Sequence, residues 1–377
     1  MSGSNILREA VLERCIECKL CQKECRFLQK YGKPRFIAEV FDAADSAHQR
    51  MVFECSLCGL CSAVCPVAVR PDRMLLEMRR EVVALGQGVF RQHSNLLRYE
   101  SRGISKHFTY YALPGNCNSV LFPGCALSGT RPGRVVQLFE LLRRYIPSLG
   151  IVFDCCAKPS HDLGRSDYFH YVFGELKEYL LRNGVQNVLV ACASCHQSFK
   201  EHGGPLAVKM VYEVFSEWGI PERAKACGVV GLHDPCAIRF ETPVNAAVRE
   251  IVKRVGLDID ELPHHGSKTL CCGEGGAVGF LAPELAKSWG AIRATEAGGR
   301  KIITYCAGCA GYLNSTLSVE HLLDLIFEPH ETLTGRVKVS RSPVTYWNRI
   351  RLKRHFKKIV DARFSRERNL GQTHHLF

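Results

Sequence analysis

Eight of the twenty cysteines in the chain form two quartets with the same spacing, C-x2-C-x2-C-x3-C. The first quartet is Cys15, Cys18, Cys21 and Cys25, and the second is Cys55, Cys58, Cys61 and Cys65. In such a run the first three thiolates bind one iron-sulfur cube, and the fourth binds a neighbouring cube. The spacing therefore predicts two cubane 4Fe-4S clusters with crossed ligand sets: Cys15, Cys18, Cys21 and Cys65 for one, and Cys55, Cys58, Cys61 and Cys25 for the other.

Two structural zinc sites are the alternative interpretation of the quartets, because four-cysteine zinc sites also use C-x2-C pairs. Such sites usually combine two C-x2-C pairs, which leaves no role for a third cysteine at the next step. The first quartet ends Cys25-Arg26 without the proline that follows Cys65, but this proline would shape a turn and supply no ligand. The spacing thus favours iron-sulfur clusters.

Ten further cysteines form a pattern that occurs twice: a lone cysteine, a vicinal pair and a C-x2-C. The first copy is Cys125, Cys155, Cys156, Cys192 and Cys195, and the second is Cys236, Cys271, Cys272, Cys306 and Cys309. The near-constant offset between the copies predicts two similar domains. Five thiolates exceed what one tetrahedral zinc ion uses, so each copy indicates a multi-iron centre or a zinc site with an additional redox thiol.

Short β-branched runs precede the cysteines of both copies. They are SVLFPGC, IVFDCC and NVLVACASC in the first copy, and GVVGLHDPC, TLCC and KIITYCAGC in the second. Helical stretches such as RVVQLFELLRRYI separate the runs, which indicates βαβ units and small parallel sheets. Because open α/β sheets bind ligands at the C-terminal ends of their strands, we expect each set of five cysteines to converge at one sheet edge.

These elements predict an α+β multidomain chain. Residues 1–95 are expected to form a mostly helical ferredoxin-like domain around the quartets, and residues 96–117 a linker without clear periodicity. Residues 118–225 and 226–330 are expected to form two pseudo-symmetric α/β domains. Residues 331–377 form a basic C-terminal tail.

The composition places further bounds on the protein. Of its 377 residues 46% are hydrophobic and 23% are charged, and no apolar run approaches the roughly 20 residues of a membrane-spanning helix. The N-terminus, MSGSNILREAVLER, lacks an apolar stretch with a small-residue cleavage site, so no secretory signal is expected. The cytoplasm is the expected compartment, and there a large cysteine count indicates metal or redox chemistry instead of disulfides.

Most of the formal net charge of +13 lies in the tail, where residues 331–377 supply +9. Leu352, Phe356, Ile359 and Val360 share one face of a predicted helix that cations surround. We expect this helix to dock on an acidic partner protein or, peripherally, on the cytoplasmic membrane. The alternative is a solvated helix packed on its own protein, and no nucleic-acid recognition module accompanies the basic patch.

With these patterns the chain resembles the D subunit of heterodisulfide reductase, equivalent to fused C and B subunits, and more broadly the cysteine-rich CCG-domain proteins of anaerobic electron transfer. The resemblance covers roughly residues 10–325, and its most specific element is the spacing C-x34-C-C-x33-C-x2-C of the second copy, with Cys271-Cys272-Gly273. It implies that the five cysteines of each copy bind a noncubane 4Fe-4S cluster and act in catalysis. Two such clusters would face each other where a disulfide is split, and the ferredoxin-like domain would deliver the electrons.

The first copy departs from the family pattern, because Ala157 stands where the CCG signature has its glycine. If the glycine allows close backbone approach to a cluster, Ala157 alters the first site. Some relatives hold zinc or nothing in the first copy. The resemblance therefore implies one or two noncubane clusters, with zinc as the alternative occupant of the first copy.

Two functions agree with this resemblance. The first is an oxidoreductase that acts on sulfur groups as one member of a complex, passing electrons through the cubane clusters to a disulfide or heterodisulfide. The second is a non-catalytic electron-transfer subunit of a flavin dehydrogenase or an electron-bifurcating complex, because such subunits share the layout. The intact first copy favours the reductase. The expected partners are a flavoprotein, ferredoxin-type or membrane cytochrome subunit and a small thiol or disulfide, without nucleic acid.

The chain is not expected to bind flavin or nicotinamide. The run CGEGG at residues 272–276 lacks the order G-x-G-x-x-G and is expected to form a tight turn in which backbone amides approach sulfur or substrate. A proton donor is needed when a disulfide becomes two thiols, and His161, His196 and His233 lie close to cysteines in the sequence. We expect each of these histidines to lie outside the ligand sets or on the surface.

Overall fold

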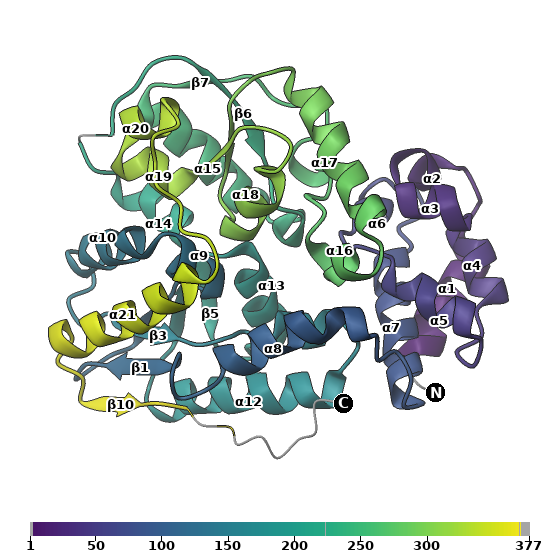
Figure 1. The fold of residues 1–377 in the computed structure, drawn as a ribbon, viewed down its shortest axis with the longest axis horizontal. Helices are drawn as coiled ribbons and strands as arrows, with labels where there is room; N and C mark the ends of the chain where they lie inside the picture. Colours follow the sequence, from purple (N-terminus) through teal and green to yellow (C-terminus); the bar gives the residue numbers. More distant parts are fainter. Residues whose placement is uncertain (1–2, 223, 369, 371–377) are drawn as a thin grey trace.

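The computed structural model describes residues 3–222, 224–368 and 370 and places them in three packed parts (Figure 1). A helical N-terminal part carries both cysteine quartets, and two α/β parts follow it along the chain. In Figure 1 the N-terminal helices lie at one end of the molecule, beside α16 (Val278–Leu281) and α17 (Pro283–Ala297) of the second α/β part. The predicted α+β architecture with small parallel sheets is confirmed.

The N-terminal part consists of helices joined by the cysteine loops. The helices are α1 (Gly3–Arg14), α2 (Leu20–Glu24), α3 (Arg26–Tyr31), α4 (Pro34–Val40), α5 (Ser46–Phe53), α6 (Leu60–Ala63) and α7 (Pro71–Ala84). Pro34 and Pro71 lie in the first turns of α4 and α7, where the missing N–H of proline is not needed. Asp45 caps α5 by accepting a hydrogen bond of 2.9 Å from the backbone N–H of His48.

The first α/β part is built on a six-stranded sheet with the order β10-β1-β3-β2-β4-β5. The strands are β1 (Tyr110–Leu113), β2 (Ser119–Phe122), β3 (Gly150–Phe153), β4 (Asn187–Val190), β5 (Ala207–Met210) and β10 (Phe364–Arg366). Strands β3, β2, β4 and β5 are parallel, whereas β1 and β10 are antiparallel additions at one edge. The helices are α8 (Ser94–Gly103), α9 (Cys125–Thr130), α10 (Pro132–Arg143), α11 (Lys158–Asp162), α12 (Ser166–Arg182), α13 (Ala193–His202) and α14 (Val211–Trp218).

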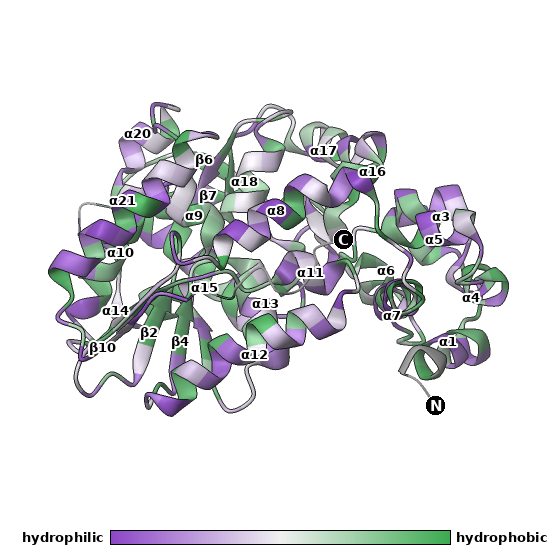
Figure 2. Ribbon diagram, turned by 60° about the horizontal axis from the view of Figure 1, so that its bottom comes forward, coloured by the Kyte–Doolittle hydropathy of each residue, from purple (hydrophilic) through white to green (hydrophobic). Residues whose placement is uncertain are grey.

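The second α/β part has a four-stranded parallel sheet with the order β7-β6-β8-β9. Its strands are β6 (Val229–His233), β7 (Asp258–Ile259), β8 (Ile302–Thr304) and β9 (Val319–His321). Its other helices are α15 (Thr242–Val255), α18 (Ala307–Leu313), α19 (Leu322–Phe327) and α20 (Pro329–Leu333). The order β3-β2-β4-β5 in the first part matches β7-β6-β8-β9 in the second, strand for strand in chain order. Figure 2 shows hydrophobic residues in strands of the first sheet, with helices beside them.

Two segments differ from the sequence-based expectations. The predicted linker 96–117 contains most of α8 and all of β1, and β1 pairs with β3 through Tyr111 opposite Val152. The run TLCC forms no strand; the equivalent strand is β7, which lies well before Cys271 in the chain. Linker prediction failed because Tyr110–Leu113 is a short apolar run without the alternation that identifies a strand.

The described residues of the C-terminal segment belong to the first α/β part, so the alternative of a helix packed on its own protein holds and the expected docking helix does not. Helix α21 (Val344–Ile359) packs along α9, and β10 joins the sheet (Figure 1). Leu352, Phe356 and Val360 are buried in the core of this part, where Phe356 meets the ring of Phe139 edge to face. The apolar face that we expected to dock on a membrane or partner is therefore covered by the chain itself, except at Ile359, which is 37% exposed. Residues 369 and 371–377 of the predicted tail lie outside the described residues.

A fully buried arginine joins the three parts. Arg79 on α7 donates to the carbonyl oxygen of Val52 at 2.9 Å within the N-terminal part. It also donates to the carbonyl oxygens of Asp162 at 2.6 Å, in the first α/β part, and of Gly276 at 3.0 Å, in the second. Because the guanidinium is planar and carries five N–H donors, one side chain can satisfy several buried carbonyls that would otherwise lack a partner.

We expect Arg79→Met to lower the free energy of unfolding by about 3–5 kcal/mol, because several buried carbonyls lose charge-assisted hydrogen bonds at once. The matched control is Arg182→Met, whose side chain is 77% exposed and forms an ion pair along its own helix with Glu178. The control should lose at most about 1 kcal/mol. Urea denaturation of the anaerobically prepared proteins gives both values, and equal losses in the two variants would contradict the role assigned to Arg79.

Candidate functional site

The two cysteine loops of the N-terminal part have the same backbone course. Glu17 and Lys19 in the first loop and Leu57 and Gly59 in the second all have positive φ, at equivalent positions of the repeat. A short helix follows each loop, α2 after the first and α6 after the second. Such turns allow the first three thiols of each run to face one point, which is what binding a single iron-sulfur cube requires.

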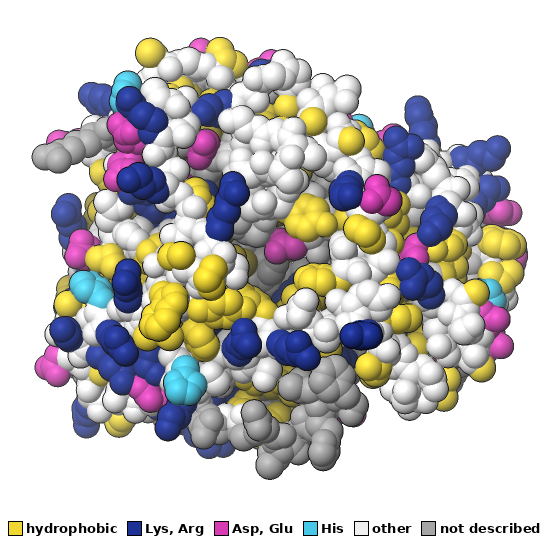
Figure 3. Space-filling view, in the orientation of Figure 1, with side chains coloured by type: hydrophobic (Ala, Val, Ile, Leu, Met, Phe, Trp, Pro, Cys, Tyr) yellow, Lys and Arg dark blue, Asp and Glu magenta, His cyan; other side chains and the backbone are white. Residues whose placement is uncertain are grey.

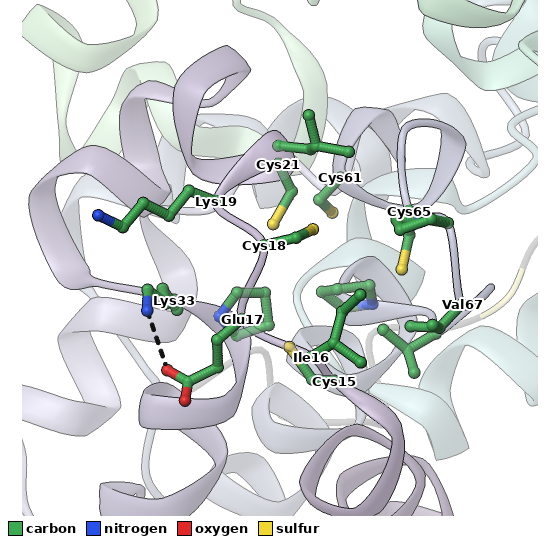
Figure 4. A pocket seen from close by; sticks show the side chains of 15 residues that line it. Cys15, Ile16, Glu17, Cys18, Lys19, Cys21, Lys33, Cys61, Cys65 and Val67 are labelled. Atoms are coloured by element: carbon green, nitrogen blue, oxygen red, sulfur yellow. Dashed lines mark hydrogen bonds and ion pairs between the residues drawn. The ribbon is translucent and has the colours of Figure 1, made fainter.

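The first crossed set is brought together around one small pocket. Cys15, Cys18, Cys21 and Cys65 line it, together with Cys61 from the second loop (Figure 4). Burial raises the pKa of the Cys21 thiol to about 11, and the neighbouring thiolates of Cys15, Cys18 and Cys65 act in the same direction. Cys18 is exposed, so this site lies at the surface of the molecule.

The second crossed set lies deeper in the protein. Cys25, Cys55 and Cys61 are buried, and Cys58 is partly buried. Burial raises the pKa of Cys25 far above its usual range, with contributions from the thiolates of Cys58 and Cys55. Burial raises the pKa of Cys55 to about 12. The structure therefore places the last cysteine of each quartet beside the first three of the other.

The five cysteines of the first α/β part converge from three strand ends. Cys125 follows β2, Cys155 and Cys156 follow β3, and Cys192 and Cys195 follow β4. The Sγ atoms of Cys156 and Cys195 are 3.5 Å apart. A hydrogen bond from Cys155 lowers the pKa of Cys125 to about 7, and the charge of Arg349 acts in the same direction.

Ala157 has a positive φ, as the glycine at the equivalent position of the second copy does. Its φ is +53°, in the left-handed region, and the equivalent Gly273 has φ +103°. A left-handed alanine costs roughly 1 kcal/mol, which the surrounding packing must offset. The alanine thus lowers the local stability of a turn that still has positive φ at this position.

The second copy converges in the same way. Cys236 follows β6, Cys306 and Cys309 follow β8, and Cys271 and Cys272 come from the long connection after β7. Hydrogen bonds from Cys236 and Cys272 lower the pKa of Cys271 well below its usual range, and the backbone N–H of Gly273 donates to its Sγ at 3.2 Å. The predicted approach of a backbone amide to sulfur in the CGEGG turn is therefore present.

The two five-cysteine sets touch each other. Cys192 of the first set has Cys195 of its own set and Cys306 of the second set as its nearest influences, and both lower the pKa of the Cys192 thiol well below its usual range. Cys192 and Cys306 immediately precede α13 and α18, which occupy equivalent places in the two parts. The pseudo-symmetry therefore brings equivalent cysteines face to face.

A cleft of about 280 Å³ lies between the two α/β parts, beside this contact. Cys125 borders it from the first set, and Tyr99, Glu274, Gly308 and Tyr312 border it from the other elements. Burial raises the pKa of the Glu274 carboxyl to about 8, with the nearby thiolates of Cys306 and Cys271 acting in the same direction. Figure 3 shows a hollow near the centre of the molecule, with an acidic side chain at its edge and hydrophobic side chains around it.

The second quartet lies against the second five-cysteine set. Burial raises the pKa of Cys58 to about 11, and the thiolate of Cys271 contributes. Arg239, which follows Cys236 closely in the chain, donates to the carbonyl oxygen of Cys58 at 2.9 Å. A Cβ at Gly276 would lie 2.4 Å from the carbonyl oxygen of Cys55, so only glycine permits this approach of the two loops. The cysteine sites thus form a continuous series from the surface to the cleft.

All donors in these sets are thiol groups, which are the ligands that iron-sulfur clusters use. His233 of the second part also lies close to Cys272 and Cys309, in an arrangement that could hold a metal ion. His196 is buried on α13, and His161 packs beside Asp162, with 2.9 Å between its Nδ1 and the carboxylate. Cys117 is buried and Cys227 is exposed, both apart from the cysteine sets.

Sequence reasoning missed two residues that line the cleft and one that lies beside the first cysteine set. Tyr99 and Glu274 line it, and Arg349 lies on α21 beside Cys125 and Cys155. The guanidinium of Arg349 lies over the ring of Phe108, 4.7 Å from its centroid. One signal was available, because Arg349 shares the apolar face of its helix with Leu352 and Phe356, at spacings of three and seven residues.

Comparisons with known proteins agree with this division of the chain. A family model for the 4Fe-4S dicluster domain matches residues 11–69, and one for the cysteine-rich CCG domain matches residues 230–314. Of the helices within the described part of the chain, none has the length and apolar character that spanning a membrane would require.

The chain is similar to named redox proteins along most of its length. It is 26% identical over 352 residues to the B subunit of fumarate reductase (CoM/CoB) from Methanothermobacter marburgensis, covering 83% of this chain and 70% of that protein. It is 21% identical over 390 residues to the D subunit of dihydromethanophenazine:CoB–CoM heterodisulfide reductase from Methanosarcina barkeri, covering 84% and 93%. It is 22% identical over 276 residues to EtfAB:quinone oxidoreductase from Syntrophomonas wolfei, covering 64% and 38%.

Proposed function

We propose that this chain, which belongs to the iron-sulfur proteins that join a ferredoxin-type domain to CCG domains, reduces a disulfide as one member of a redox complex. The observation that carries the proposal is the contact between the two complete five-cysteine sets at Cys192 and Cys306, beside an open cleft. A relay subunit without a substrate has no need of two such sets at one cleft. The names of the relatives, which include the D subunit of heterodisulfide reductase and the B subunit of fumarate reductase (CoM/CoB), support a role in such complexes.

The proposed ligands are the eighteen cysteines of the four sets described above. The crossed quartets would hold two cubane clusters, and the two sets of five would each hold a noncubane cluster. When bound, these clusters supply single electrons at potentials that their hydrogen bonds and exposure determine. The lowered pKa values of Cys192 and Cys271 favour metal binding in both larger sets, because the thiolate is the form that ligates metal.

The proposed reaction is RSSR′ + 2 e⁻ + 2 H⁺ → RSH + R′SH, in which the S–S bond breaks and each sulfur gains one electron and one proton. The cleft can hold the disulfide within reach of both sets, because Cys125 and the segment at Gly308 border it from opposite sides. Small residues in its wall, among them Gly129 and Gly311, leave room for the substrate. Tyr99 and Tyr312 close the cleft with larger rings.

Electrons would enter at the surface and end at the cleft. The set that contains Cys18 is exposed, and apolar side chains of Ile16 (62% exposed) and Leu20 (47% exposed) lie beside it. An electron-donating partner protein can dock there and bury them. The series then continues through Cys58 to Cys271 without leaving the protein interior. We place the protein in the cytoplasm, where a flavoprotein or ferredoxin-type partner can reach this face.

The second candidate is a relay subunit without a substrate of its own. The similarity to EtfAB:quinone oxidoreductase favours it, because that protein's name describes electron transfer to a quinone. In this case the cleft would be closed by a partner and the two larger sets would only pass electrons onward.

The two candidates differ in what oxidises the reduced protein. The anaerobically purified chain is reduced with titanium(III) citrate, freed of reductant and mixed with bis(2-hydroxyethyl) disulfide or oxidised glutathione. We expect one disulfide to be consumed, and two thiols to be formed, for every two electrons that the protein loses. Disulfides that leave the protein reduced, while a one-electron dye reoxidises it at once, would support the relay subunit.

A further inference from the structure

A buried histidine lies beside the second five-cysteine set. His233 is the last residue of β6, and it is only 1% exposed. One of its ring nitrogens, the Sγ of Cys272 and the Sγ of Cys309 all lie within 4.8 Å of one another. Its backbone is also fixed, because the hydroxyl of Thr304 donates to its carbonyl oxygen at 2.9 Å.

Arg293 determines which ring nitrogen of His233 carries the proton. The Nε of Arg293 donates to Nδ1 of His233 at 3.1 Å. Arginine remains protonated and has no acceptor, so Nδ1 must offer its lone pair and cannot carry hydrogen. The proton of the neutral ring is then on Nε2, which makes that nitrogen a donor.

The position of Arg293 is itself fixed by several partners. Its other nitrogens donate to the carbonyl oxygen of His264 at 2.7 Å, the carboxylate of Glu296 at 2.6 Å and the hydroxyl of Thr269 at 3.1 Å. The side chain is 1% exposed, so it cannot turn away to free Nδ1. The ring of His233 therefore keeps one orientation and one tautomer.

The Nε2 atom of His233 is buried and has no hydrogen-bond partner within the described part of the chain. A buried N–H without a partner costs about 1–3 kcal/mol. The two sulfurs, which lie within 4.8 Å of a ring nitrogen of His233, are the nearby acceptors, and they become thiolates when they bind metal. A metal bond to Nε2 would require that nitrogen to lose its proton. The proton cannot move to Nδ1, because Nδ1 accepts the hydrogen bond from Arg293.

We propose that His233 donates a hydrogen bond from Nε2 to the thiolates of Cys272 and Cys309 in the iron-sulfur centre of the second set, and that it is not a metal ligand. This inference rests on the proposed function only in assuming that the second set holds a cluster. His233 is thus a positioning residue that acts through sulfur. A hydrogen bond to a ligating sulfur withdraws charge from it and raises the reduction potential of the centre.

The two cysteine sets differ at the position that His233 occupies. Phe122 ends β2 as His233 ends β6, three residues before the lone cysteine in each copy. The first set therefore has a ring without a donor at this place, and its nearby cation is Arg349 on the C-terminal helix. Two otherwise similar centres would differ in potential, which gives electrons a preferred direction between them.

The test combines two variants with a matched control. His233→Phe copies the first domain and removes the donor, while His233→Gln retains a side-chain N–H. The control is His321→Phe: His321 is fully buried, accepts from the backbone N–H of Leu323 at 3.2 Å through Nδ1, and faces Arg131 and Arg134. Iron content and the midpoint potential of the second-set centre are measured for each, with the signal assigned by its loss in Cys272→Ser.

We expect His233→Phe to lower this midpoint potential, His233→Gln to lower it less and His321→Phe to leave it unchanged, all at full iron content. In the wild-type protein, electron-nuclear double resonance of the reduced centre should show an exchangeable proton and only weak nitrogen coupling. This spectrum needs no variant, so a His233→Phe protein that fails to fold does not remove the test.

A strong nitrogen coupling typical of direct coordination would overturn the inference, as would an unchanged potential in both His233 variants. A second set that binds no iron in the wild-type protein would overturn the inference together with the proposed noncubane site. A second set that binds iron while the protein reduces no disulfide would count against the proposed reaction alone, because the potentials and spectra can still be measured.

Discussion

Replacing Cys272 with serine should abolish disulfide reduction while the iron of the N-terminal part remains. Cys272 lies between Cys271 and Cys309 in the hydrogen-bonded series of sulfurs, and it is only 3% exposed. Its loss removes the sulfur between the connection that carries Cys271 and the C-terminal end of β8, so the set can no longer enclose a cluster. We expect a loss of activity far beyond the roughly 10–100-fold that removal of a group outside the ligand set costs.

The matched control for this variant is Cys117→Ser. Cys117 is buried, as Cys272 is, but its thiol donates to the carbonyl oxygen of Ser119 at 3.3 Å and belongs to none of the four sets. The control should keep its iron and its activity. Titanium(III)-driven thiol formation and iron content are measured for both proteins. Full activity in Cys272→Ser would refute the assignment of the second set to disulfide reduction.

Replacing Cys25 with serine should remove the cluster of the second quartet instead of its own. Cys25 has the thiolates of Cys58 and Cys55 as neighbours, whereas Cys21 has Cys15, Cys18 and Cys65. We expect a loss of about four iron atoms per chain. Electron delivery to the cleft should also stop, because the second quartet lies between the exposed site and Cys271.

Two marker variants identify the cluster that is lost. Cys18→Ser removes a ligand of the exposed site, and Cys58→Ser removes one of the buried site. The electron paramagnetic resonance signal missing in Cys25→Ser should be the signal missing in Cys58→Ser. If it is the signal missing in Cys18→Ser, the ligand sets are not crossed. Cys227→Ser, an exposed cysteine outside the sets, should retain both signals.

Features that depend on local spacing could be predicted from the sequence. The repeated C-x2-C-x2-C-x3-C loops, the parallel sheets and the cysteines at strand ends follow from short-range pattern and from the geometry of βαβ units. The ferredoxin-type domain near the N-terminus and the CCG domain that follows it were also predicted correctly.

Features that depend on contacts between distant segments could not be read in this way. The contacts of Cys192 with Cys306 and of Cys58 with Cys271 join different parts of the molecule, and no local spacing determines how domains pack. Arg79 gave no signal, because a buried arginine is recognised only when its distant carbonyl partners are known.

The C-terminal helix shows what an amphipathic pattern cannot predict. An amphipathic basic helix has the same pattern whether its apolar face meets a membrane, a partner or its own protein. Leu352 and Phe356 are covered by the first α/β part, which the pattern could not reveal. The position of Arg349 beside Cys125 then turns a segment that was expected to be peripheral into a neighbour of the first cysteine set.

The most direct test of the central claim is iron and acid-labile sulfide per chain after anaerobic purification. Electron paramagnetic resonance of the oxidised protein accompanies it, before and after addition of candidate thiols. Two cubane and two noncubane clusters predict about 16 iron atoms per chain and a signal that the thiol changes. About 8 iron atoms, with zinc present and no response to thiols, would contradict disulfide reduction at paired cysteine sets and favour a relay subunit.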